Sequence, residues 1–181
     1  AHDCVEAVHQ IATGFASSVV SIGLIQGDAL GGGLEGAICC NVLVAERSVK
    51  MGLPEILFHS FPGMGAYSFL SRRIGLAQTE RMITSGRIYS AEEMREMGVV
   101  DIVVDDGEGE AAVHEYISAT PRNHSVREAL FRVRQRVAPI SIEELRDVTD
   151  IWVDIMMKLP TADLRRMELL QQAQVRRLTR H

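Results

Sequence analysis

The sequence predicts an α/β protein whose C-terminal region is entirely helical. Between residues 18 and 104, short β-branched apolar runs are separated by segments with the period of amphipathic helices. Beyond Gly109 no strand pattern appears, and only helices can be drawn. The chain has 181 residues, 46% of them hydrophobic and 24% charged, which excludes a disordered or fibrous protein. We therefore expect a core over residues 1–109 and a helical region over residues 110–181.

The first elements follow from the spacing of apolar residues. Val5, Val8 and Ile11 recur at helical spacing and predict an amphipathic helix over residues 2–15. The β-branched run from Ser18 to Ile25 predicts a buried strand, and residues 27–31 predict a loop. The next elements are expected, in chain order, to be a helix buried on all sides at 32–40, strands at 41–45 and 49–51, helices at 66–74, 77–85 and 90–98, and a strand at 99–104.

Turn and cap residues mark the remaining boundaries. The segment Phe61–Gly65 has turn chemistry, and Ser90 with Glu93 forms a capping box at the start of its helix. Prolines lie between the predicted C-terminal helices, where a missing N–H does least harm. These helices are expected at 110–119, 125–137, 141–158 and 161–179.

Composition excludes several functions. A net charge of −5 and a pI near 5.7 argue against general nucleic-acid binding. No apolar run approaches the length of a membrane span, and six scattered histidines show no metal-ligand spacing. Three cysteines, two of them neighbours, imply no disulfide framework and indicate a reducing, cytoplasmic compartment. The chain begins with Ala1 and no signal pattern, so we expect either processing or a piece of a longer protein.

Two glutamates twenty residues apart stand in unusual backbone settings. Glu35 closely follows a triple glycine, Gly31–Gly33, and Glu55 follows Pro54. Each glycine costs a helix or strand about 0.5–1 kcal/mol relative to alanine, so the triplet indicates a bare backbone beside a ligand. Two carboxylates in one cleft, beside backbone N–H donors, are the groups needed to move protons next to a polarised carbonyl. A lone glutamate at a helix start also has a simpler interpretation, because it stabilises the helix dipole.

The same glycines match a dinucleotide-binding fingerprint, G-x-G-x-x-G at 31–36, with Glu55 near the position of the ribose-binding acid. Four residues separate Gln26, at the end of the predicted strand, from this motif, whereas the fingerprint needs its first glycine in the turn itself. Glu35 would place a negative charge where the pyrophosphate binds. Pro54 disfavours a central strand that ends in Glu55. We therefore favour proton transfer over nucleotide binding.

Three segments carry a resemblance to a known family: Gln26–Glu35, Met51–Leu57 and Phe61–Ala66. Together they resemble the crotonase (enoyl-CoA hydratase/isomerase) superfamily. Within it, Phe61–Ala66 and the helix that contains Trp152 resemble the bacterial diffusible signal factor synthases, which make cis-2-unsaturated fatty acids for quorum sensing. The resemblance implies a ββα spiral, the ClpP/crotonase fold, that is incomplete here at its N-terminus. It also implies C-terminal helices that cover an acyl pocket and mediate oligomer contacts.

The resemblance assigns roles to individual residues. It implies that Glu35 and Glu55 are the catalytic pair and that Gly32 supplies one N–H of an oxyanion hole. The substrate-binding residues that it implies are Leu30, Gly31, Met64, Trp152 and Leu170. For the apolar members of this set, core packing is the simpler alternative. Cys39 and Cys40 are expected to be small core residues rather than nucleophiles.

The implied reaction is dehydration of a 3-hydroxyacyl thioester, followed by hydrolysis that releases a cis-2-unsaturated fatty acid. No cofactor is implied beyond the thioester carrier, which is CoA or acyl carrier protein. The partners implied are the acyl thioester, acyl carrier protein, a sensor kinase and further copies of the chain in a trimer or hexamer. No nucleic acid, membrane or metal is expected.

The chain departs from the family pattern at its start. The family takes its second oxyanion-hole N–H from an earlier segment with a Gly-Gly-Asp-like motif, and nothing similar precedes Ala16. Loss of one such donor typically lowers the rate by about 10²–10³-fold. Two alternatives therefore stay open: a general enoyl-CoA hydratase or isomerase of fatty-acid metabolism, and a catalytically silent fragment that binds a partner.

Arginines crowd the end of the chain, where an apolar stripe predicts a helix. A solvated face or a subunit contact is the simpler interpretation. The alternative is a docking site for an acidic acyl carrier protein, since clustered positive charge attracts acidic partners. The arginines concerned are Arg165, Arg166, Arg176, Arg177 and Arg180.

Overall fold

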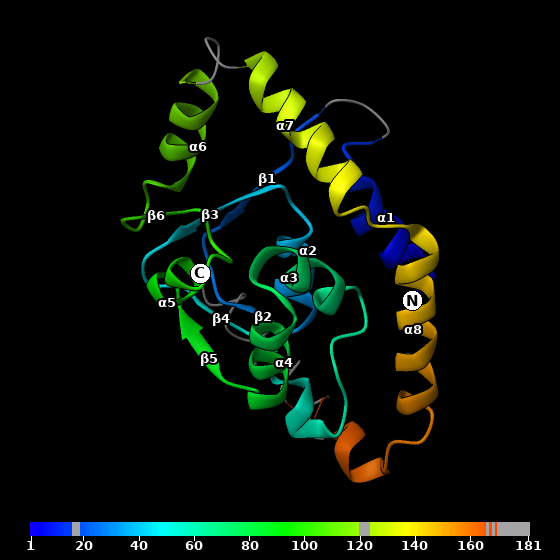
Figure 1. Cartoon of the computed structure of the whole chain (residues 1–181). Coiled ribbons are helices and arrows are strands. Elements are labelled where there is room, and N and C mark those ends of the chain that lie inside the picture. Colours follow the sequence, from blue (N-terminus) through cyan, green and yellow to red (C-terminus); the bar gives the residue numbers. More distant parts are fainter. Residues whose placement is uncertain (16–18, 120–123, 166, 168, 170–181) are drawn as a thin grey trace.

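The computed structural model describes residues 1–15, 19–119, 124–165, 167 and 169 (Figure 1). Two three-stranded sheets form its framework. In the first sheet all neighbours are parallel and the order is β1-β3-β6. Its strands are β1 (Ile22–Ile25), β3 (Val42–Glu46) and β6 (Ile102–Val104). All five residues of β3 are buried, as expected for the central strand of a covered parallel sheet.

The second sheet has the order β2-β4-β5, with β2 parallel to β4 and β4 antiparallel to β5. Its strands are β2 (Ala29–Leu30), β4 (Lys50–Gly52) and β5 (Ile88–Ser90). The chain passes directly from the first sheet to the second twice, once after β1 and once after β3. Because β2 and β4 are parallel neighbours, the segments that follow them start at the same edge, where the Gly31 N–H donates to the Gly52 carbonyl at 2.9 Å.

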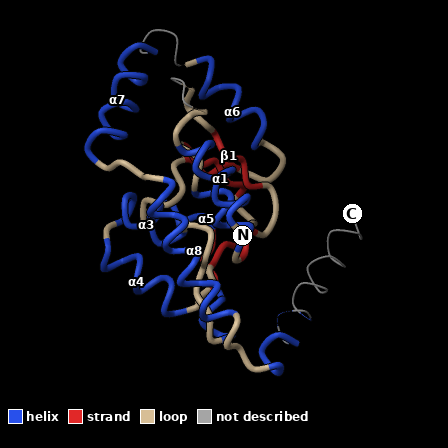
Figure 2. Tube along the Cα trace, turned by 90° about the vertical axis from the view of Figure 1, so that its right-hand side faces the viewer, coloured by secondary structure: helices blue, strands red, loops and turns tan. Residues whose placement is uncertain are grey.

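Helices surround the two sheets. α6 and α7 lie together at one end of the molecule, and α1 and α8 pack side by side (Figures 1 and 2). The short helix α2 contacts β1, β2 and α3, which places it against both sheets. The helical elements are α1 (His2–Ala12), α2 (Gly32–Ile38), η1 (Pro54–Phe58), α3 (Ala66–Ile74), α4 (Leu76–Ser85), α5 (Ala91–Glu96), α6 (Gly109–Ser118), α7 (His124–Val137) and α8 (Ile142–Met156).

The α/β class and the helical character beyond Gly109 are confirmed for the described part of the chain. The loop predicted at 27–31 is partly wrong, because Ala29 and Leu30 pair with Met51 and Gly52 as β2. The strand β5 and the 3-10 helix η1 were not predicted. All three are very short, so their hydrophobic period is too brief to detect, and long-range pairing decides their conformation.

The expectation that the helix at 32–40 is buried on all sides is wrong. Leu34, Glu35 and Ile38 are buried, but Gly32, Gly33 and Gly36 are exposed, because α2 presents a glycine face away from the sheets. The strand predicted at 99–104 is also shorter than expected. The Val99 and Val100 amides both bond the Met94 carbonyl and close the end of α5, so pairing with β3 begins only at Ile102.

The last predicted helix is only partly described. Residues 161–165 are helical, whereas Leu170 and the arginines at 166, 176, 177 and 180 lie outside the described residues. Among the helices that the structure describes, none is both long and apolar enough to cross a membrane. Within the same residues, no group of three or more His, Cys, Asp or Glu side chains could hold a metal ion.

Candidate active site

Glu35 is a buried carboxylate at the start of α2. Glu35 is only 3% exposed. Its Oε1 atom accepts hydrogen bonds from the Met64 N–H at 2.7 Å and from the Ala66 N–H at 3.2 Å. Burial raises the pKa of Glu35 to about 7, because the charged form loses its hydration. The amide donors oppose this shift, and the nearby charge of Glu55 adds to it. Near neutral pH the group is therefore able both to accept and to donate a proton.

Glu55 reaches the same place from a different element. It lies in the first turn of η1, where Pro54 supplies a backbone angle that suits a helix start. Its Oε2 atom is buried and has no hydrogen-bond partner among the described residues. Burial raises the pKa of Glu55 as well. A buried carboxylate oxygen without a partner is a group that a bound ligand or water could satisfy.

Two glycines of the triplet, Gly31 and Gly32, lie next to side chains of the candidate site. Gly31 adopts a φ of +56°, and a Cβ atom there would lie 2.8 Å from Glu55 Oε1. A Cβ atom on Gly32 would lie 3.0 Å from the Cε atom of Met64. The bare backbone therefore lets the Glu55 carboxylate lie directly against Gly31 while Met64 closes over Gly32. The positive φ explains glycine at position 31, whereas at position 32 a side chain would meet only the flexible end of Met64.

The start of α2 also supplies hydrogen-bond donors. The Gly31 N–H is taken by the Gly52 carbonyl, and the first helical bond runs from the Glu35 N–H to the Gly31 carbonyl at 3.0 Å. The amides of Gly32 and Gly33 precede that bond, and the first amides of a helix have no acceptor inside it. Gly32 is exposed. Gly32 lies three residues before Glu35, and we expect its N–H to be open to a substrate oxygen.

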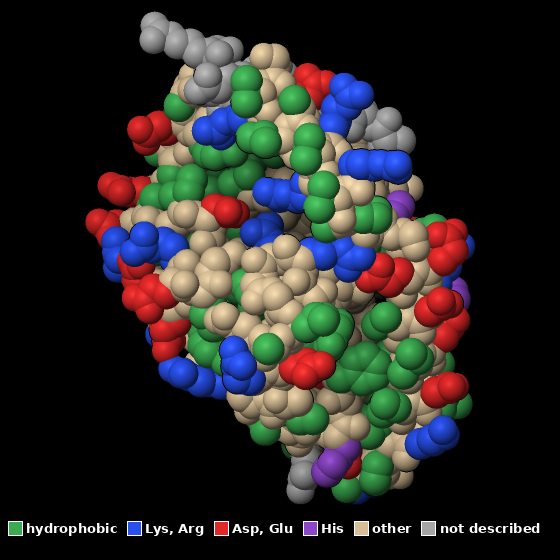
Figure 3. Space-filling model, in the orientation of Figure 1, with side chains coloured by type: hydrophobic (Ala, Val, Ile, Leu, Met, Phe, Trp, Pro, Cys, Tyr) green, Lys and Arg blue, Asp and Glu red, His purple; other side chains and the backbone are tan. Residues whose placement is uncertain are grey.

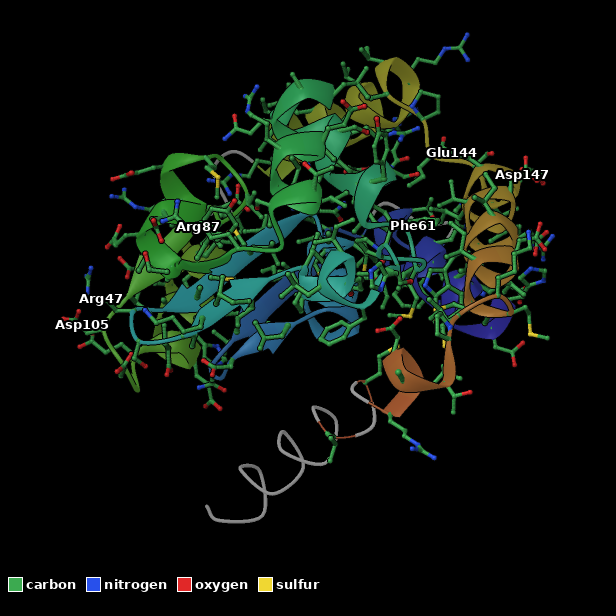
Figure 4. All side chains as sticks on the ribbon, turned by 90° about the horizontal axis from the view of Figure 1, so that it is seen from below. Arg47, Phe61, Arg87, Asp105, Glu144 and Asp147 are labelled. Carbon is green, nitrogen blue, oxygen red and sulfur yellow. The ribbon has the colours of Figure 1, made fainter. Side chains whose placement is uncertain are left out.

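The loop that supplies the Met64 amide is held by α8. A Cβ atom on Gly63 would lie 2.3 Å from the indole Cγ of Trp152, so the ring packs directly on the glycine backbone. The buried Thr149 hydroxyl donates to the Gly63 carbonyl at 2.8 Å. Figure 4, where Phe61 is labelled, shows this loop entering between the core and α8. The C-terminal region is therefore part of the surroundings of the glutamates.

The structure brings together most of the residues predicted for the site. Glu35, Glu55, Gly31, Gly32 and Met64 form one cluster. The half-buried Leu30 is the last residue of β2 and immediately precedes Gly31. Trp152 packs on Gly63, the residue before Met64. Leu170 lies outside the described residues. The catalytic and substrate-binding roles of these residues stay predictions.

Sequence reasoning missed Thr149. It lies three residues before Trp152 and four after the fully buried Leu145, so the three side chains share one face of α8. That helical spacing was the available signal. It was not sufficient, because the spacing shows which face is buried but not which loop packs against it.

A separate cavity of about 250 Å³ lies between α7 and the start of β3 and does not contain the glutamates. Basic side chains gather around this hollow (Figure 3), among them Arg72, Arg73 and Arg134. The guanidinium groups of Arg72 and Arg73 are already engaged. Arg72 pairs with Glu144, and Arg73 donates to the carbonyls of Cys40, Asn41 and Val99. These contacts tie the cavity wall to the rest of the framework. Cys39 on that wall is buried, as expected for a small core residue, whereas Cys40 is only half-buried.

Comparison with known families identifies the class of protein that this fold and site define. The family model for enoyl-CoA hydratase/isomerase matches residues 7–135. The rat mitochondrial methylglutaconyl-CoA hydratase is 36% identical over 133 residues, which are 72% of this chain and 40% of that protein. The chain belongs to the enoyl-CoA hydratase/isomerase family. It spans about 40% of the length of such curated relatives.

Solved structures agree with the assignment of the fold. The enoyl-CoA hydratase from Bacillus halodurans superposes with a TM-score of 0.73 at 24% identity, over 93% of this chain and 66% of that one. Pseudomonas aeruginosa DspI superposes with a TM-score of 0.63 at 28% identity, over 92% of this chain and 58% of that one. The predicted crotonase-like α/β fold is therefore confirmed.

Proposed function

We propose that the protein acts on acyl thioesters by the hydratase/isomerase chemistry of its family, with Glu35 and Glu55 as the proton-transfer pair. One observation carries this proposal. The buried Glu35 and the half-buried Glu55 come from separate elements and meet beside the glycine triplet, close enough for the charge of Glu55 to raise the pKa of Glu35. A structural role does not require two carboxylates to lie beside each other with restricted access to water, because like charges at one site repel.

The chemistry follows from these groups. A thioester carbonyl oxygen placed on the Gly32 N–H would be polarised, so that negative charge on it is stabilised when the α-proton is removed. One glutamate takes the α-proton of a 3-hydroxyacyl thioester, and the other gives a proton to the departing hydroxyl, which leaves as water. Hydration of the 2-enoyl thioester is the same sequence in reverse. Met64, Leu30 and Trp152 are proposed to contact the acyl chain.

The reaction needs no resident cofactor, because the thioester carrier is part of the substrate. Coenzyme A is the carrier named for the relatives, for example the methylglutaconyl-CoA hydratase of rat. We extend that carrier to this protein as part of the proposal. An acyl carrier protein, a sensor kinase and a homo-oligomer stay expectations from the sequence.

Release of a cis-2-unsaturated fatty acid is the second candidate. It additionally requires hydrolysis of the thioester, for which the same carboxylates would activate a water. It rests on the resemblance of Phe61–Ala66 and the Trp152 helix to the signal synthases, and these two segments pack against each other at Gly63. The family match and the curated relatives favour the hydratase/isomerase reaction, which we place first.

Product analysis separates the two candidates. We expect that the protein, incubated with a 2-enoyl-CoA, forms the 3-hydroxyacyl-CoA, detected by mass spectrometry as a gain of one water with the thioester intact. Accumulation of free unsaturated acid from a 3-hydroxyacyl thioester would support the second candidate. If neither product formed above the rate of a heat-denatured control, the silent partner-binding alternative would replace both.

A further inference from the structure

The Glu35 carboxylate and the Thr149 hydroxyl bond opposite sides of one peptide unit. Thr149 Oγ1 donates to the carbonyl of Gly63 at 2.8 Å. The N–H of the same peptide unit, which belongs to Met64, donates to Glu35 Oε1 at 2.7 Å. A trans peptide is planar, and its C=O and N–H point in opposite directions. Whatever fixes the carbonyl therefore also aims the N–H.

The loop itself does little to hold this peptide plane. Gly63 adjoins this peptide on one side, and Gly65, with a φ of +108°, follows Met64, so two of the three residues here are conformationally permissive. The Gly63 carbonyl lies in a buried setting, where an unpaired oxygen is costly. Without the hydroxyl, rotation of the peptide towards another donor would relieve that cost and would turn the Met64 N–H away from Glu35.

The two hydrogen bonds also reinforce each other electronically. Donation to a peptide oxygen polarises the amide, which makes its N–H a stronger donor, and the effect is larger where water is excluded. Thr149 is 1% exposed and Glu35 is 3% exposed, so both bonds lie in such an environment. A hydrogen bond from a polarised amide stabilises the charged carboxylate more than the neutral acid.

We propose that Thr149 is a positioning residue for Glu35: its hydroxyl, through the Gly63–Met64 peptide, aims the Met64 amide at the carboxylate. The site thus depends on α8, about a hundred residues further along the chain. The inference rests on the proposed function only for its catalytic consequence, because the protonation of Glu35 can be measured without any substrate.

A purely structural role for Thr149 predicts something different. Leu145 and Trp152 would still pack on the loop in a Thr149→Val variant, since both contacts are apolar and lie on the same face of α8. Structural loss would lower stability and leave the titration of Glu35 unchanged. Glu55 is the charged group that shifts the pKa of Glu35, and its charge is the same in the wild type and in the Thr149→Val variant.

The test is a carboxyl-carbon NMR titration of Glu35 in the full chain. We expect Thr149→Val to raise the pKa of Glu35 by about half to one pH unit, since a hydrogen bond to the charged form is weakened. Thr149→Ser keeps the hydroxyl and is expected to titrate as wild type. Thr79→Val is the matched control, because Thr79 is a fully buried threonine on α4 whose hydroxyl has no partner among the described residues.

The titration distinguishes a positioning role of Thr149 from a purely structural one. A folded Thr149→Val protein with an unchanged Glu35 titration would overturn the inference, and so would a serine variant that shifts as far as the valine variant. If Thr149→Val does not fold, Thr149→Ala takes its place, because it also lacks the hydroxyl. If Thr149→Val raised the pKa of Glu35 but the wild-type protein had no hydratase activity, the proposed function would be refuted and this inference would stand.

Discussion

Glu35→Gln and Glu55→Gln are each expected to lower kcat/KM for hydration of a 2-enoyl thioester by about 10²–10⁴-fold, the usual contribution of a general acid or base. Glutamine keeps the shape of the side chain, and at position 35 its oxygen can still accept the Met64 and Ala66 amides. What is lost is the titratable group that takes up and releases a proton. Steady-state kinetics on the two variants, with folding checked by circular dichroism, measure the effect.

Glu46→Gln is the matched control for these variants. Glu46 is also a buried glutamate, but it accepts hydrogen bonds from the Gln26 side chain and the Gly109 amide at the end of β3, which explains its burial without catalysis. We expect the kcat/KM of the Glu46→Gln variant to stay within about threefold of the wild-type value, because the substitution lies outside the reacting groups. Near-wild-type activity in either Glu35→Gln or Glu55→Gln would exclude that glutamate from the proton-transfer pair.

Glu35→Gln is also expected to stabilise the folded protein in neutral and alkaline solution by up to about 3 kcal/mol. The folded-state pKa is about 7 against an ordinary value of 4.5, and each pKa unit corresponds to about 1.4 kcal/mol. Between these two values the folded protein binds more protons than the unfolded chain. Stability contributed by the protonated group is therefore complete below pH 4.5 and is lost as the pH rises towards 7.

The measurement is the difference in unfolding free energy between wild type and Glu35→Gln, from urea titrations at pH 4.5 and pH 8. The difference cancels the contributions of carboxylates that do not interact with Glu35, some of which have lowered pKa values, such as Glu92 and Glu93. We expect the advantage of the variant to grow by about 2–3 kcal/mol between the two pH values. An advantage that is independent of pH would mean that Glu35 is not a strained buried acid.

The positions of the two glutamates could be predicted from the sequence because local chemistry fixes them. The glycine triplet permits the left-handed backbone that Gly31 adopts before Glu35, and Pro54 starts a helical turn at Glu55. Their convergence needs one more fact, the parallel pairing of β2 with β4, and that pairing could not be derived from strands of two and three residues. The motifs indicated the site, whereas the fold explains why its members meet.

The environment of Glu35 could not be predicted for the same physical reason. Its donors are Met64, in a glycine-containing loop that packs against α8, and Ala66, the first residue of α3. Trp152 was predicted as an acyl-chain contact, and its position on Gly63 places it next to the site, but Thr149 carried no motif at all. Hydrogen bonds between segments far apart in the chain leave no periodic signal.

The central claim is that Glu35 and Glu55 form one proton-transfer site, and the titration of Glu35 in a Glu55→Gln variant tests it most directly. Carboxyl-carbon NMR on the full chain is expected to give a pKa for Glu35 below the wild-type value of about 7, because the charge of Glu55 no longer opposes its ionisation. Burial, which is the larger cause, should keep the pKa above 4.5. An unchanged Glu35 pKa would show that the two carboxylates do not interact, and would contradict the account.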